Sequence, residues 1–205
     1  EPPRAAAPPA GERRRGATIP PLHPQTDAPL DMLHSVRIRF DPLEDRLEVV
    51  IRVDDDGAYR FHLTRRMAVK LASQLQILAV WSAEVPESVD AVTRGSIAAS
   101  HHSALAAQAS FAPSPPPASP LVVHTGERPM LVTDVQCGRR NEDEKWLLAF
   151  RYGERDTLSL VLQQATLHGI IELLRRKLKE AEWGLTLLPE PAPAQSAAAH
   201  AKVMH

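Results

Sequence analysis

Few residues in this 205-residue chain have the types and spacing that chemistry requires. The single cysteine, Cys137, lies in an alternating strand pattern, where a buried structural thiol is more common than a nucleophile. The adjacent histidines His101 and His102 would point about 100° apart on a helix, so they form a poor chelating pair. The sequence contains neither a glycine-rich phosphate loop nor a G-x-S-x-G motif. These residues favour a protein that is not an enzyme and has no catalytic residue, cofactor or metal ion.

Two short stretches resemble segments of metal-binding proteins but lack the remaining metal ligands. The acidic run Asp54 to Gly57 reads like the start of a calcium loop, yet Arg66 stands where such a loop needs its distant glutamate. The segment His124 to Pro129 matches the linker between classical zinc fingers, but a finger needs two cysteines and the chain has one. We interpret the first stretch as a hairpin turn and the second as a turn before a strand.

Basic side chains form several short clusters along a chain whose formal net charge is −1. A dedicated nucleic-acid-binding domain usually carries a basic excess, so the clusters indicate a local contact at most. Acidic residues are interspersed among them, which is also typical of a solvated helix face. Nucleic-acid association is therefore the alternative function, and its candidate contacts are Arg13, Arg14, Arg15, Arg175, Arg176 and Lys179.

Residues 34–82 have the pattern of three strands followed by a helix. Apolar residues alternate with polar ones in SVRIRF, RLEVVIRV and YRFHL, and turn sequences separate these stretches. Thr64 stands where a helix N-cap belongs, and apolar residues then recur at spacings of four, four and three from Met67 to Leu78. The segment predicts a β-β-β-α unit.

Residues 123–187 repeat this order. The strand patterns MLVTDVQC, KWLLAFRY and TLSLVL precede a helix pattern over residues 167–181. An offset of 99 aligns residues 46–75 with residues 145–174 without a gap. We expect an α+β fold built as a tandem, pseudo-symmetric β-β-β-α repeat with antiparallel strands and one helix in each unit. The alternative is two unrelated α+β segments with loops of similar length.

Proline and alanine dominate outside the two units. We interpret residues 1–33 as a proline-rich arm, residues 83–122 as a linker and residues 188–205 as a tail. Such segments bury too little apolar surface to offset the entropy lost on ordering, so we expect them to be disordered or ordered by a partner. The sequence has no run of 18 apolar residues, and no membrane-spanning helix is expected.

The second unit carries apolar residues on the outward face of its strands. In the alignment Leu147, Ala149 and Val161 take the places of Glu48, Val50 and His62. Strands that are apolar on both faces are usually covered on both faces, so these three residues predict a partner interface. Trp81 and Trp183 close their helix patterns and are either core edges or anchors of the same interface.

These patterns lead to one expected function. We expect a non-enzymatic protein–protein interaction protein or a structural subunit of a larger assembly, such as an accessory or particle component. Its partner would be another protein or a second copy of the chain. With one cysteine a disulfide framework is excluded, and a reducing, cytoplasmic location is expected. The start at Glu1 is compatible with the removal of a leader.

Overall fold

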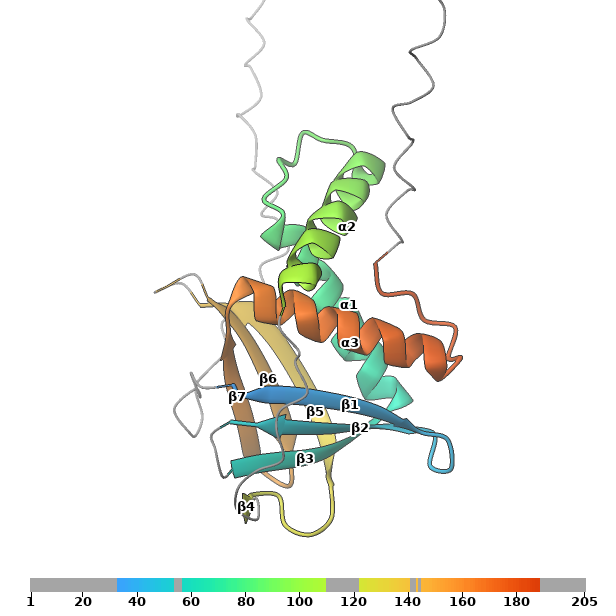
Figure 1. The fold of residues 1–205 in the computed structure, drawn as a ribbon, viewed down its shortest axis with the longest axis vertical. Helices are drawn as coiled ribbons and strands as arrows, with labels where there is room; N and C mark the ends of the chain where they lie inside the picture. Colours follow the sequence, from blue (N-terminus) through green and yellow to red (C-terminus); the bar gives the residue numbers. More distant parts are fainter. Residues whose placement is uncertain (1–32, 54–56, 110–121, 141–142, 144, 189–205) are drawn as a thin grey trace, which may run out of the picture.

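The computed structural model of the protein describes residues 33–53, 57–109, 122–140, 143 and 145–188 (Figure 1). Three strands and a helix form the first half, and a second helix and a short strand lead into a second half of the same order. The strands in this part of the chain are β1 (Ser35–Asp41), β2 (Arg46–Arg52), β3 (Gly57–Thr64), β4 (Val122–Val123), β5 (Met130–Arg139), β6 (Trp146–Tyr152) and β7 (Asp156–Leu162). The helices are α1 (Arg65–Ser82), α2 (Ala91–Gln108) and α3 (Gln164–Glu180).

The alternating pattern of the first half produces a three-stranded antiparallel sheet in which β1 pairs with β2 and β2 with β3. The apolar side chains of each strand point to one face, where Leu47 and Leu63 are fully buried as neighbours on β2 and β3. The Oγ1 atom of Thr64 accepts a hydrogen bond from the backbone N–H of Met67 at 3.4 Å, and α1 begins at Arg65. The predicted N-cap is therefore confirmed.

The second half has the same arrangement of strands. β5 pairs with β6 and β6 with β7, both antiparallel, and the register of β5 shifts between Val132 and Asp134. Leu158, Leu160 and Leu162 of β7 are buried, and the chain then enters α3. In Figure 1 the strands of this half run in a different direction from those of the first half.

The two halves join into one mixed sheet through β3 and β5. These strands are parallel, with Phe61 opposite Met130 and His62 opposite Leu131, and the sheet has the order β1-β2-β3-β5-β6-β7. The two-residue strand β4 pairs in parallel with the start of β3. One continuous sheet therefore contains strands from both halves.

Helices α1 and α3 each pack against the other half. α1 lies on β5, the first long strand of the second half, and α3 lies on β1, the first strand of the first half. Lys70 of α1 forms an ion pair with Asp134 of β5, and Arg65 donates a hydrogen bond to the carbonyl oxygen of Trp183 at 2.9 Å. The apolar residues of both halves consequently form one hydrophobic core.

Helix α2 forms a layer outside the other two helices. It packs on α1 and α3, which lie between it and the strands (Figure 1). The Oδ1 atom of Asp90 accepts hydrogen bonds from the amides of Val92 and Thr93 at 3.0 and 2.9 Å, and these bonds cap the helix. Its buried residues are small or polar, namely Ala98, Ala99 and His102. Tertiary packing thus orders a helix in a segment whose composition predicts a linker.

The predicted α+β class is confirmed, and two details of the predicted fold are wrong. The strands are not all antiparallel, because β3 and β5 pair in parallel, and α2 adds a helix beyond one per unit. Leu188, assigned to the tail, is buried in the core. The predicted arm and tail, the acidic turn and part of the linker lie outside the described residues, at 1–32, 189–205, 54–56 and 110–121. None of the described helices combines the length and the apolarity needed to cross a membrane.

Candidate functional site

The predicted interface on the second half is mostly covered. Ala149 and Val161 are 6% and 5% exposed, and Leu147 is half-buried. These three residues lie on neighbouring strands, because Leu147 is the register partner of Val161 and Ala149 is two residues along β6. The structure therefore brings the three predicted residues together but leaves little of their surface accessible to a partner.

The two tryptophans have different environments. Trp183 is 5% exposed, donates a hydrogen bond from Nε1 to Asp45 Oδ1 at 2.6 Å, and lies edge-on to the ring of Phe40. It belongs to the core, where it connects the segment after α3 to the β1–β2 turn. Trp81 is 41% exposed at the end of α1. Of the two tryptophans, Trp81 is the one that a partner could contact.

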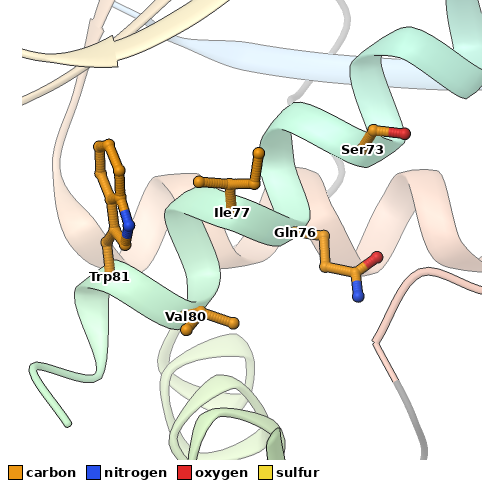
Figure 2. Close-up of a pocket in the computed structure, with 5 residues that line it drawn as sticks. All are labelled: Ser73, Gln76, Ile77, Val80 and Trp81. Carbon is orange, nitrogen blue, oxygen red and sulfur yellow. The ribbon is translucent and has the colours of Figure 1, made fainter. Parts of the chain in front are cut away.

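Trp81 belongs to an apolar row on the exposed side of α1. Val69, Ser73, Ile77 and Trp81 follow one another at intervals of four residues, and we call this row the α1 stripe. Its three large members are 37%, 45% and 41% exposed. A shallow groove lined by Ser73, Gln76, Ile77, Val80 and Trp81 runs along it, and Figure 2 shows Ile77 and Trp81 pointing to the same side of the helix. Large apolar groups in a row on an exposed helix face indicate an interaction surface.

A buried hydrogen-bonded chain connects the three helices below this surface. Ser82 Oγ of α1 lies 2.9 Å from His168 Nε2 of α3, and His168 Nδ1 lies 3.0 Å from His102 Nδ1 of α2. His102 Nε2 lies 3.5 Å from an oxygen of Glu172 on α3. Ser82, His102 and His168 are 5%, 5% and 0% exposed. This histidine chain is the main polar attachment of α2 to the other helices.

The hydrogen bonds determine where the protons of the histidine chain lie. Ser82 donates its hydroxyl proton to the carbonyl oxygen of Ala79 at 2.8 Å, so it can only accept from His168 Nε2–H. Neutral His168 then accepts from His102 Nδ1–H. Burial, together with the neighbouring histidines, lowers the pKa of His168 to about 4, so the ring is neutral at pH 7. A second proton on His168 would place two N–H groups opposite each other.

The chain from Ser82 through His168 to His102 is a structural network and not a catalytic triad. Ser82 is buried and its proton is committed to Ala79, so no substrate can reach an activated hydroxyl. Across the described residues, no three His, Cys, Asp or Glu side chains come together to hold a metal ion. His124 is exposed and lies beside the ring of Tyr59.

The candidate nucleic-acid contacts on α3 are largely paired with one carboxylate. Glu172 accepts hydrogen bonds from Arg175 Nε at 2.8 Å and from Arg176 Nε at 2.7 Å. Burial raises the pKa of Glu172, but these hydrogen bonds outweigh that effect and lower it to about 2. Lys179 is exposed one turn further on, and the Arg13–Arg15 cluster lies outside the described residues. The helix face thus presents less free positive charge than its sequence suggests.

Cys137 is expected to react with thiol reagents only when the protein unfolds. The residue is 2% exposed on β5, and burial raises the pKa of its thiol to about 12, so the reactive thiolate is absent at neutral pH. A colorimetric disulfide reagent should modify no thiol in the native protein and one thiol in urea. Complete modification at the same rate with and without urea would contradict this burial.

Comparison with known proteins gives no relative. No family model matches the chain, and no curated protein or solved structure is similar to it. The surfaces described above therefore provide the only guide to the function of the described part of the chain.

Proposed function

We propose that this protein is a non-enzymatic interaction subunit that associates with a second copy of itself through the α1 stripe. The observation that supports this function is the row of three large, exposed apolar side chains on one helix. Other large exposed residues in the described part of the chain do not form a row at helical spacing: Leu43 lies on a turn, and Val92 and Ile97 are five residues apart on α2. The buried Ser82 and Cys137 offer no accessible nucleophile, which weighs against an enzyme.

The stripe is complementary to itself when two α1 helices pack antiparallel around a two-fold axis. If residues whose numbers sum to 150 face each other, Val69 meets Trp81 and Ser73 meets Ile77 of the second copy. Small side chains then lie opposite large ones, and each contact occurs twice, as a two-fold interface requires. Such an interface buries the aromatic residue that most often anchors protein–protein contacts.

Charge supports the same register. The charged residues of α1 are Arg65, Arg66 and Lys70, all near its N-terminus. Antiparallel packing places Arg66 beside Glu84 of the second copy, near the negative end of that helix dipole. Arg66 is exposed, and the side chain of Glu84 is 76% exposed although it lies 3.9 Å from Arg139 of its own chain, so both are accessible. A parallel arrangement would instead place the basic ends together.

We also propose that the two halves are copies of one folding unit. The pairing registers support this: adding 99 to Arg37↔Val50 gives Gln136↔Ala149, and adding 99 to Leu47↔Leu63 gives Trp146↔Leu162, and all four pairs occur. The reciprocal packing of α1 on β5 and of α3 on β1 supports it as well. We further propose that the protein is part of a larger assembly and that its location is reducing and cytoplasmic.

Replacing Ile77 with aspartate is expected to weaken self-association by more than about tenfold, because a carboxylate would enter an apolar contact. Analytical ultracentrifugation should show the wild-type mass rising with concentration from 22.5 kDa towards twice that value, while Ile77→Asp stays at the monomer mass. Val92→Asp is the matched control, because Val92 is 80% exposed outside the stripe. A wild-type chain that remains monomeric up to about 100 µM contradicts self-association.

A charge exchange tests the register. Arg66→Glu should weaken the dimer because two acidic groups then face each other in each of the two symmetry-related contacts. The double variant Arg66→Glu with Glu84→Arg should restore association, since opposite charges face each other again. Failure of the second change to restore it would rule out the antiparallel register.

A further inference from the structure

A second candidate surface lies on the outer face of β1, β2 and β3, away from the core. Strand pairing places Arg37, Val50 and Arg60 in one row across the three strands, and Arg39, Glu48 and His62 in the next row. A pocket on this face is lined by Arg37, Arg39, Glu48, Val50 and Arg60. We call it the arginine trough.

Glu48 fixes two of the three guanidinium groups of the trough. It is 8% exposed and accepts hydrogen bonds from Arg39 Nη2 at 2.7 Å and from Arg60 Nη2 at 2.9 Å. Arg60 also donates from Nη1 to the carbonyl oxygen of Glu127 at 3.3 Å. Burial raises the pKa of Glu48, but the hydrogen bonds from Arg60 and Arg39 outweigh it, so the carboxylate is ionised at neutral pH. Because Glu48 already holds the Arg39 and Arg60 side chains in place, little further side-chain entropy is lost when a ligand binds to them.

The third guanidinium group is free to bind a ligand. The side chain of Arg37 is exposed and makes no hydrogen bond or ion pair with any side chain or backbone group in the described part of the chain. Three arginines and one glutamate give the trough a formal charge of +2. Nearby on the same face, Glu44 lies 3.5 Å from His62 and 3.6 Å from Arg46, so its negative charge is paired with Arg46 outside the trough. The remaining positive charge matches a ligand with two negative charges.

We propose that the arginine trough binds a phosphate monoester group. A monoester carries a charge of about −1.5 to −2 at neutral pH, and its oxygens match the forked donors of arginine. The half-buried side chain of Val50 forms the floor, and the lining includes no aromatic ring on which a nucleic-acid base could stack. The pocket therefore favours a single doubly charged group over a single-stranded nucleic acid.

Titration of the full chain with inorganic phosphate and with phenyl phosphate, followed by NMR, tests this proposal. Both ligands should shift the Val50 methyl and Arg60 amide signals, and affinity should rise from pH 5 to pH 7 as the second phosphate proton dissociates. Dimethyl phosphate, with one charge, should bind at least about tenfold more weakly. If phenyl phosphate binds and inorganic phosphate does not, the site recognises an organic phosphate ester. If the two bind equally well, the site recognises the phosphate group itself.

Arg37→Gln should weaken phosphate binding about tenfold or more, because one charge-assisted contact is lost. The fold should be unaffected, since the Arg37 side chain has no polar partner among the described residues, and Arg155→Gln, an exposed arginine in the turn between β6 and β7, is the matched control. Equal losses in the two variants, or equal affinity for dimethyl phosphate, would overturn the proposal. So would a short single-stranded oligonucleotide that binds more tightly than phosphate and loses affinity steeply with salt. These variants leave helix α1 unchanged, so the result is independent of self-association.

Discussion

Replacing Phe61 with alanine is expected to lower the free energy of unfolding by about 4 kcal/mol, the range for a fully buried phenylalanine. Phe61 is 0% exposed on β3, where it pairs with Met130 across the junction of the two halves. Its ring stacks on Phe150 at 5.6 Å and lies 5.1 Å from Tyr152. The substitution therefore removes contacts with β5 and β6 and leaves a cavity between the halves.

Urea denaturation of Phe61→Ala, followed by circular dichroism and tryptophan fluorescence, measures this loss. One transition should shift to lower urea in both signals, because a shared core unfolds as a unit. Leu43→Ala is the control; Leu43 is 95% exposed in the β1–β2 turn and its change should cost less than about 0.5 kcal/mol. A loss below about 1 kcal/mol, or separate transitions for the two halves, would show that the core is not shared.

Lowering the pH from 7 to 5 is expected to reduce the free energy of unfolding by about 2 kcal/mol. The pKa of His168 is about 4 in the folded protein, whereas an unperturbed histidine in the unfolded chain has a pKa of 6.5. Between these two pH values the unfolded chain therefore binds a proton that the folded chain does not bind. The contribution of His168 to the free energy of unfolding is fully present above the unfolded pKa of 6.5 and is lost as the pH falls towards 4. Burial also lowers the pKa of His102, despite the nearby Glu172, and this adds to the loss. Below about pH 4.5, protonation of carboxylates in the unfolded chain contributes too.

His168→Gln separates this effect from other titrations. A glutamine amide can donate to Ser82 and accept from His102, so it preserves both hydrogen-bonding roles without a titrating group. Between pH 6.5 and 5, the free energy of unfolding of the variant should depend less steeply on pH than that of the wild type. The difference in slope should correspond to the uptake of about one proton on unfolding. Direct NMR titration of His168 provides a second measurement that does not depend on the variant folding. A wild-type stability that stays flat over this interval, or a His168 pKa near 6.5, would contradict the assigned role.

Local patterns were sufficient to predict the six longer strands and two of the helices, but not the two-residue strand β4. Alternation in SVRIRF and RLEVVIRV specifies half-buried strands, and Thr64 specifies the start of α1, because these signals depend on residues close in sequence. The same patterns could not predict that β3 pairs in parallel with β5, which depends on contacts between residues about 70 positions apart.

The surfaces were harder to predict than the fold. Trp81 and Trp183 both come near the ends of their helix patterns, and the hydrogen bond to Asp45 and the contact with Phe40 distinguish Trp183 as a core residue. α2 lacks a row of large apolar residues and docks through His102, so its sequence reads as a linker. The arginine trough exists only once β1 and β3 lie on either side of β2, and no local signal indicates it.

The reciprocal packing of α1 on β5 and of α3 on β1 has a consequence for biosynthesis. When residues 33–82 leave the ribosome, the strand that α1 covers has not yet been made, and the strand β1 lacks its helix until α3 emerges. The nascent first half must therefore wait with exposed apolar surface until nearly the whole described chain is available. On a crowded polysome, α3 from one nascent chain could cover β1 of its neighbour, so translation speed and chaperone supply would govern the yield of correctly folded protein.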